Sequence, residues 1–88
     1  MPEIRVTVAS KVGLHARPAA LLAKAASGQA VPVSIRKEGG EQVDAASVLG
    51  LMTLGAMHGD EVILSAEGAG ADEALAAVAD IITTDLDG

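Results

Sequence analysis

The chain has 88 residues, half of them apolar, with no aromatic side chain, no cysteine and a formal charge of −6. A chain of this length is expected to fold as one domain over residues 1–88, around an aliphatic core. Nucleic acid is excluded as a partner, because its binding needs clustered Lys and Arg, whereas the six basic residues here are scattered.

The N-terminus has no apolar run that would serve as a signal peptide. No stretch approaches the ~20 apolar residues that a membrane span needs. Without cysteine there is neither a disulfide framework nor thiolate chemistry. We therefore expect a soluble cytoplasmic protein that does not insert into membranes, and we expect it to need no metal and no cofactor.

The chain begins with an alternating segment over residues 3–9, in which Ile4, Val6 and Val8 share one side. This period of two predicts a half-buried strand. A loop follows, and Gly13 gives its backbone the freedom to turn.

The apolar spacing becomes helical from residue 16 to about residue 27. Pro18 is tolerated in the first turn of this predicted helix, and Gly28 ends it. The side chains expected on its buried face are Ala19, Leu22, Ala23 and Ala26.

A second alternating segment places Val31, Val33 and Ile35 on one side, with Pro32 near its start. Residues 38–40 predict a turn, and residues 41–45 a short returning strand.

Ser47 is suited to N-cap a short helix through about Leu54, which Gly55 ends. Residues 61–66 predict another strand, and residues 72 to about 83 the last helix. Their expected core residues are Val62, Leu64, Leu75, Val78, Ala79 and Ile82. The order β-α-β-β-α-β-α predicts an α+β fold, with a mostly antiparallel four-stranded sheet and all three helices on one face.

The most informative segment is VGLHARPAA, residues 12–20, where His15 stands between a glycine loop and a helix start. The first turn of a helix attracts anions through its unpaired N–H groups and its dipole. Arg17 adds a guanidinium that fits phosphate oxygens, and His15 a ring nitrogen that is nucleophilic when neutral. The combination indicates a phosphoryl-accepting site. The ordinary alternative is a capping or solvated His15 beside a solvated Arg17.

The GLHARPAA run resembles the active-site signature of HPr, the phosphocarrier family of the bacterial phosphoenolpyruvate-dependent sugar phosphotransferase system. Residues 46–55, ASVLGLMTLG, resemble the segment around that family's regulatory serine. With both motifs at the right separation, the chain is identified as a member, and the resemblance implies a single HPr domain over residues 1–88.

The resemblance implies an open-faced β-sandwich with sheet order 1-4-2-3. It also implies that the phosphohistidine of Enzyme I phosphorylates His15 on Nδ1 and that His15 passes the group to the A domains of sugar-specific Enzyme II permeases during sugar uptake. Arg17 would hold the phosphoryl oxygens. The protein would then be a stoichiometric carrier with a transient phosphohistidine rather than an enzyme, and we expect a monomer.

Ser47 is fully explained as a helix cap. In many Gram-positive members the matching serine is phosphorylated by HPr kinase/phosphorylase, so Ser47 is also a candidate regulatory site. Ala45 and Ala46 stand where those members carry a basic residue, and both interpretations stay open.

The candidate partner-docking residues are Leu14, Ala20, Val48, Leu49 and Met52. The short helix after Ser47 cannot bury all its apolar side chains, although the ordinary alternative places Val48, Leu49 and Met52 in the core. His58 lies in a turn before the last strand, and a solvated loop residue is the favoured interpretation.

Three other functions are alternatives to a general sugar phosphocarrier. An enzyme using His15 as a general base is disfavoured, because GLHARPAA supplies no carboxylate partner, nucleophile or metal cluster. A purely regulatory HPr-like protein is disfavoured by the presence of His15. A carrier for a nitrogen-related, fructose-specific or dihydroxyacetone relay stays open, since the partner surface decides it.

Overall fold

A computed structural model describes residues 3–9, 13 and 16–84. Its elements follow the predicted order β-α-β-β-α-β-α. They are β1 (Glu3–Thr7), α1 (Ala16–Ser27), β2 (Val33–Lys37), β3 (Val43–Asp44), α2 (Val48–Leu54), β4 (Glu61–Ala66) and α3 (Ala71–Ile82).

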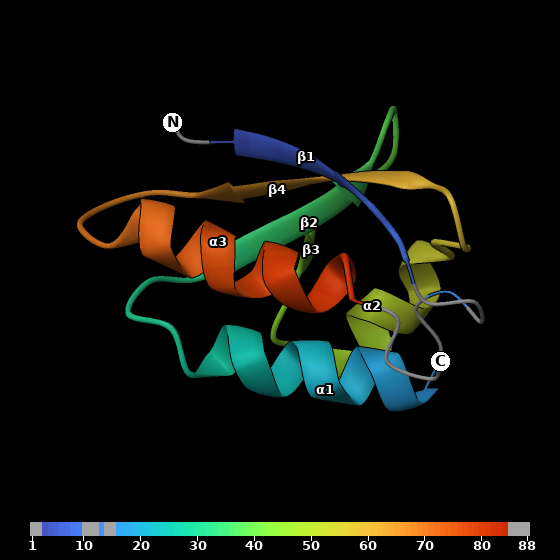
Figure 1. The fold of residues 1–88 in the computed structure, drawn as a ribbon, viewed down its shortest axis with the longest axis horizontal. Coiled ribbons are helices and arrows are strands. Elements are labelled where there is room, and N and C mark those ends of the chain that lie inside the picture. Colours follow the sequence, from blue (N-terminus) through green and yellow to red (C-terminus); the bar gives the residue numbers. More distant parts are fainter. Residues whose placement is uncertain (1–2, 10–12, 14–15, 85–88) are drawn as a thin grey trace.

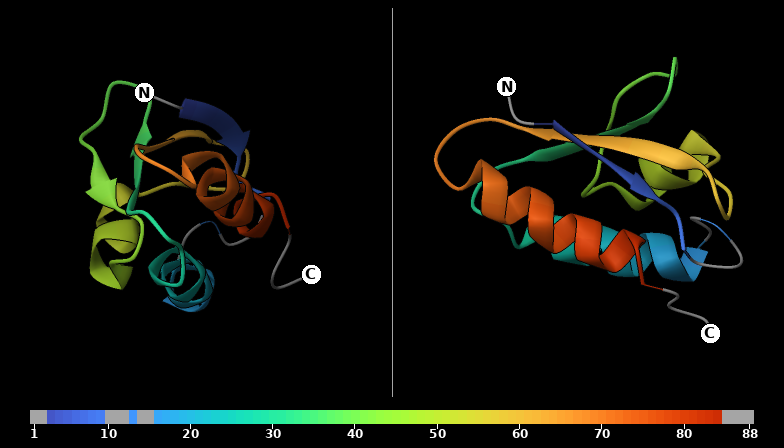
Figure 2. Two further views of the ribbon diagram at one scale, coloured as in Figure 1. Left: turned by 90° about the vertical axis from the view of Figure 1, so that its left-hand side faces the viewer. Right: turned by 45° about the horizontal axis from the view of Figure 1, so that its top comes forward.

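The strands form one four-stranded sheet in the order β1-β4-β2-β3, with every neighbouring pair antiparallel. The three helices cover one face of this sheet and leave the other face open (Figure 1). The end-on view in Figure 2 shows α1 and α3 running side by side beneath the strands. The predicted fold class and strand order are therefore confirmed.

The core is an aliphatic layer between the sheet and the helices. The alanine-rich face of α1 is buried as predicted, and its small side chains let the helix pack closely against both α2 and α3. Of the predicted core residues of β4 and α3, only Ala79 is partly rather than fully buried. The largest fully buried side chains are Leu22, Ile35, Leu51, Leu64, Leu75 and Ile82.

The predicted bounds of both long helices hold to within a residue. The first and third strands are shorter than predicted, and the second begins after Val31, which was expected to belong to it. Strand β1 stops at Thr7 because the backbone N–H of Ala9 donates to Ile82 O of α3, at 3.0 Å, rather than to a strand. Strand β2 starts at Val33, directly after Pro32, whose ring nitrogen cannot donate to a sheet.

Strand β3 keeps only two of the five residues predicted for it. The last backbone contact with β2 is the hydrogen bond from the Ala45 N–H to Val33 O at 2.9 Å. The next N–H, that of Ala46, donates instead to the Asp44 carboxylate at 2.9 Å. The N–H of Ser47 donates to Asp44 O at 3.0 Å, so the chain turns directly into α2.

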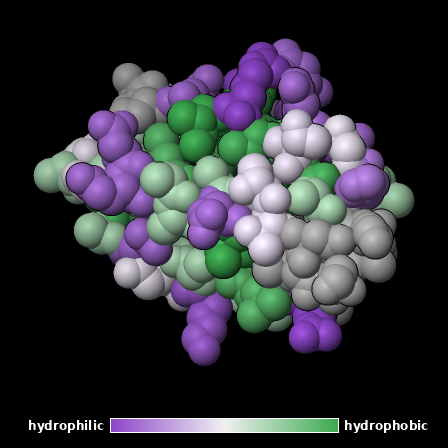
Figure 3. Space-filling model, in the orientation of Figure 1, coloured by the Kyte–Doolittle hydropathy of each residue, from purple (hydrophilic) through white to green (hydrophobic). Residues whose placement is uncertain are grey.

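The open face of the sheet is covered by charged side chains. Ile63 points away from the helices, yet it is only 3% exposed, because Arg5 and Arg36 flank it in register on β1 and β2. The stems of long cationic side chains can cover apolar surface while their charged ends stay in water. Figure 3 shows hydrophilic side chains gathered along the upper edge, above the strands.

These cations are neutralised by carboxylates on the same face. Arg5 pairs with Glu38 and, at 3.7 Å, with Glu61. Arg36 pairs with Glu3 at 3.8 Å. The open face therefore carries little unbalanced positive charge.

No helix in the described part of the chain is long and apolar enough to cross a bilayer.

The contribution of α2 to the core gives a first prediction. Leu51 is the only buried residue of α2, whereas Leu49 is 73% exposed. Leu51→Ala should lower the free energy of unfolding by about 2–4 kcal/mol, because it leaves a cavity in the core beneath α2. Leu49→Ala, the matched control, should change it by less than about 0.5 kcal/mol. Urea denaturation measures both, and equal losses would contradict this packing.

Candidate functional site

The chain reaches the predicted phosphoryl-accepting segment through Gly13, which is buried and has a φ of +72°. A Cβ at this position would lie 2.6 Å from Ala56 O and 3.0 Å from Met57 Cα. Both the left-handed backbone and the close approach therefore require glycine. This contact explains the first residue of the GLHARPAA run in physical terms.

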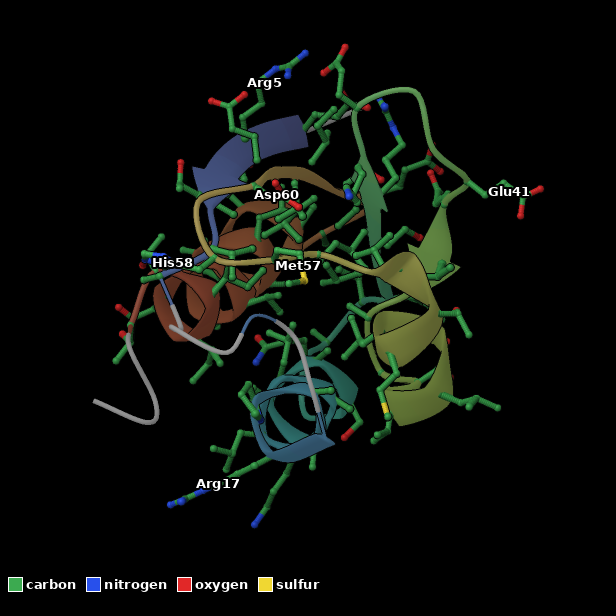
Figure 4. The ribbon with its side chains drawn as sticks, turned by 90° about the vertical axis from the view of Figure 1, so that its right-hand side faces the viewer. Arg5, Arg17, Glu41, Met57, His58 and Asp60 are labelled. Carbon is green, nitrogen blue, oxygen red and sulfur yellow. The ribbon has the colours of Figure 1, made fainter. Side chains whose placement is uncertain are left out.

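His15 and Leu14 lie outside the described residues, so the role predicted for each stays a prediction. The residue after His15, Ala16, is the first residue of α1. Arg17 is exposed in the first turn, and Figure 4 shows it extending from α1 away from the body of the molecule. The first turn of α1 contains no acidic residue that would repel an anion.

A tight turn over residues 57–60 lies directly against Gly13. The backbone N–H of Asp60 donates to Met57 O at 3.0 Å, and Gly59 adopts a φ of +88°, as the third residue of a type II turn requires. The Asp60 carboxylate closes the same turn, because its Oδ2 accepts from the backbone N–H of Met57 at 3.0 Å. Oδ2 also lies 3.3 Å from Lys37 Nζ.

These two contacts hold the pKa of the Asp60 carboxyl below its usual value. The larger cause is the hydrogen bond from the Met57 N–H, and the second is the interaction with Lys37. The carboxylate is therefore charged at neutral pH and accepts both hydrogen bonds.

The same turn holds the end of β1. The N–H of Val8 donates to Asp60 O at 2.9 Å, and the N–H of Gly59 donates to Val8 O at 3.0 Å. Val8 on one side of the loop and Gly13 on the other thus both contact residues 56–60. Residues 56–60 therefore fix both Val8 and Gly13, which lie on either side of positions 10–12.

Ser47 is the N-cap of α2, as predicted. Its Oγ accepts a hydrogen bond from the backbone N–H of Gly50 at 3.0 Å, and its side chain is half-buried. Gly55 ends the helix with a φ of +71°. The helix therefore begins and ends where the sequence predicted.

Apolar side chains remain exposed on α1 and α2, which pack against each other. We call them the helical apolar surface: Ala20, Leu21, Val48, Leu49 and Met52. The alternative that placed Val48, Leu49 and Met52 in the core is wrong, because these residues are 39%, 73% and 43% exposed.

Sequence reasoning missed two exposed apolar residues. Leu21 is 41% exposed, and the signal for it was present, because Leu21 falls outside the buried helical spacing of α1. Met57 is 55% exposed in the turn that contacts Gly13, and no periodic pattern marked it.

His58 is an exposed residue of the same turn (Figure 4), as predicted. Within the part of the chain that the structure describes, no three His, Asp or Glu side chains come together as metal ligands.

A family model described as "PTS HPr component phosphorylation site" matches residues 2–84. The chain belongs to the HPr family of phosphocarrier proteins of the phosphotransferase system. The phosphocarrier protein HPr of Streptomyces coelicolor is 42% identical over 87 residues, which cover 99% of this chain and 94% of its own.

Solved HPr structures share the fold. A crystal structure of HPr from Bacillus anthracis has a TM-score of 0.86 at 38% identity, covering 92% of this chain and 95% of its own. An HPr dimer from Thermoanaerobacter tengcongensis has a TM-score of 0.70 at 41% identity, covering 93% of each chain. At least one HPr with this fold has therefore been crystallised as a dimer.

The Ser47 cap gives a second prediction. Ser47→Ala removes the acceptor of the Gly50 N–H and should lower the free energy of unfolding by about 1 kcal/mol. Ser47→Asp keeps an acceptor and places a negative charge at the helix N-terminus, so its stability should match that of the wild type. Urea denaturation compares the three proteins. An Ala variant as stable as the wild type would show that the cap contributes nothing.

Proposed function

We propose that His15 is the phosphoryl-accepting residue of this carrier, that Enzyme I is the donor and that the A domains of sugar-specific Enzyme II permeases are the acceptors. The main support is the family match over residues 2–84, which spans the complete GLHARPAA run. The described flanks are consistent with this proposal, because Gly13 has a left-handed backbone two residues before His15, and α1 begins at the residue after His15.

The transfer exchanges one nitrogen–phosphorus bond for another. The lone pair of neutral His15 Nδ1 attacks phosphorus as the bond to the Enzyme I histidine breaks, and that histidine keeps the bonding electrons. Because the bond formed resembles the bond broken, the step is reversible, whereas a serine ester would be less suited to onward transfer. The protein supplies mainly position and charge stabilisation.

Arg17 and the first turn of α1 would stabilise the charge on the transferred oxygens. Arg17 is exposed in that turn and follows the proposed phosphohistidine by two residues, within the reach of a long guanidinium side chain. The unpaired N–H groups of the turn act in the same direction.

The helical apolar surface is the proposed docking site for both partners, with Leu14 as a further docking residue outside the described part of the chain. The surface combines small, β-branched and flexible apolar side chains from two helices. Methionine adapts its shape readily, which suits a carrier that must bind several partners in turn.

Ser47 is proposed as a second, regulatory phosphorylation site for HPr kinase/phosphorylase. It is adjacent to Val48 and Leu49 of the docking site, so a phosphate there would place charge beside the partner.

The remaining proposals concern where and in what form the chain acts. We propose that it acts in the cytoplasm as one monomeric HPr domain over residues 1–88. Light scattering tests the monomer, and a dimer at working concentration would contradict it.

The assignment of His15 gives a third prediction. With phosphoenolpyruvate and a bacterial Enzyme I, the wild type should gain one acid-labile phosphoryl group, and His15→Ala should gain none. His58→Ala is the matched control, since it removes the other histidine, and it should be phosphorylated at the wild-type rate. Phosphate on His15→Ala would disprove the assignment.

The role of Arg17 gives a fourth prediction. Arg17→Gln removes the charge but keeps much of the aliphatic stem, and it should slow phosphoryl acceptance about tenfold or more. The melting temperature should change little, because Arg17 is exposed. Arg36→Gln makes the same change on the open face of the sheet, and it should leave the rate unaltered. An equal loss of rate in both variants would mean that overall charge, rather than position, is responsible.

A further inference from the structure

We propose that Asp60 is a positioning residue for phosphoryl transfer, because its side chain holds the turn against which Gly13, and thus the chain leading to His15, is packed. This inference rests on the proposed function of His15. Asp60 itself is offered neither as a ligand of the phosphoryl group nor as a partner contact.

The first step of the argument is the closure of the turn. Asp60 Oδ2 is the acceptor for the backbone N–H of Met57, at 3.0 Å. Figure 4 shows Asp60 and Met57 beside each other on the same loop. Lys37 Nζ, 3.3 Å from the same oxygen, ties the carboxylate to the end of β2. The position of the Met57 backbone therefore depends on the Asp60 side chain.

The second step is the contact between this turn and Gly13. The space for Gly13 is bounded by Ala56 O and Met57 Cα, which leave no room even for a methyl group. A shift of the Met57 backbone must therefore be transmitted to Gly13, since closely packed atoms cannot absorb it. Gly13 lies two residues before His15.

The third step is the hold on Val8. Asp60 O and Gly59 N, in the same turn, form the two backbone hydrogen bonds to Val8. One carboxylate thus stabilises the contacts made at both described ends of the loop. In-line transfer is sensitive to position, and a displacement of about 1 Å can cost on the order of 100-fold in rate.

The test compares Asp60→Ala, Asp60→Asn and the control Asp80→Ala, which removes a carboxylate exposed on α3. Enzyme I-dependent phosphorylation is measured at a temperature at which circular dichroism shows all the proteins to be folded. Asp60→Ala should lower the maximal rate about tenfold with an unchanged KM for the carrier, because fewer molecules present His15 correctly. Asp60→Asn keeps an acceptor for the Met57 N–H, so it should recover most of the rate. Asp80→Ala should match the wild type.

A second readout is the backbone amide signal of Gly13 in nuclear magnetic resonance spectra. The chemical shift of this signal should change in Asp60→Ala and stay the same in Asp80→Ala.

A maximal rate for Asp60→Ala within twofold of the wild type would overturn the positioning role, and so would a change confined to KM. If the wild type itself accepts no phosphoryl group, the proposed function fails and the role of Asp60 fails with it. These two failures are told apart by the wild-type reaction alone.

Discussion

The close approach of the Gly13 backbone to Ala56 and Met57 is the constraint on which the start of α1, and with it the proposed site, depends. A side chain at Gly13 would collide with a carbonyl oxygen that belongs to the segment between α2 and β4. The loop before α1 and the loop before β4 are therefore fitted to each other. The hydrogen bonds from Val8 to Asp60 and from Gly59 to Val8 complete this junction on the side of β1.

The two faces of the molecule differ in how they use charge. On the open face of the sheet, Arg5 and Arg36 lie over Ile63. Both form ion pairs with carboxylates, which neutralise most of their positive charge. On the helical side, α1 contains no acidic residue, and apolar side chains of α1 and α2 stay exposed. A protein with a net charge of −6 thus keeps a basic residue at the start of α1, where an anionic group would be bound.

Features that depend on local sequence could be predicted, and features that depend on contacts between distant segments could not. The bounds of α1, the Ser47 cap and the Gly55 end of α2 follow from spacing and capping chemistry, which act within a few residues. The turn that follows β3 was missed, because there the Asp44 carboxylate takes the N–H of Ala46 as a donor.

In the candidate site, too, the features set by local sequence were predictable and those set by distant contacts were not. The GLHARPAA run predicted a phosphoryl-accepting histidine and its arginine, and the family match supports the carrier function. The roles of Met57 and Asp60 were not predicted, because only the folded chain brings residues 56–60 against Gly13. Likewise, Ile63 is an ordinary strand residue in the sequence, and its cover by Arg5 and Arg36 depends on the strand register.

The most direct test of this account is nitrogen-15 and phosphorus-31 resonance spectroscopy of the labelled wild-type chain during incubation with Enzyme I and phosphoenolpyruvate. The account predicts a single phosphoryl group, bonded to Nδ1 of His15, which disappears when an Enzyme II A domain is added. A phosphoryl group on Nε2 or on any other residue would contradict it, and so would one that the A domain does not remove.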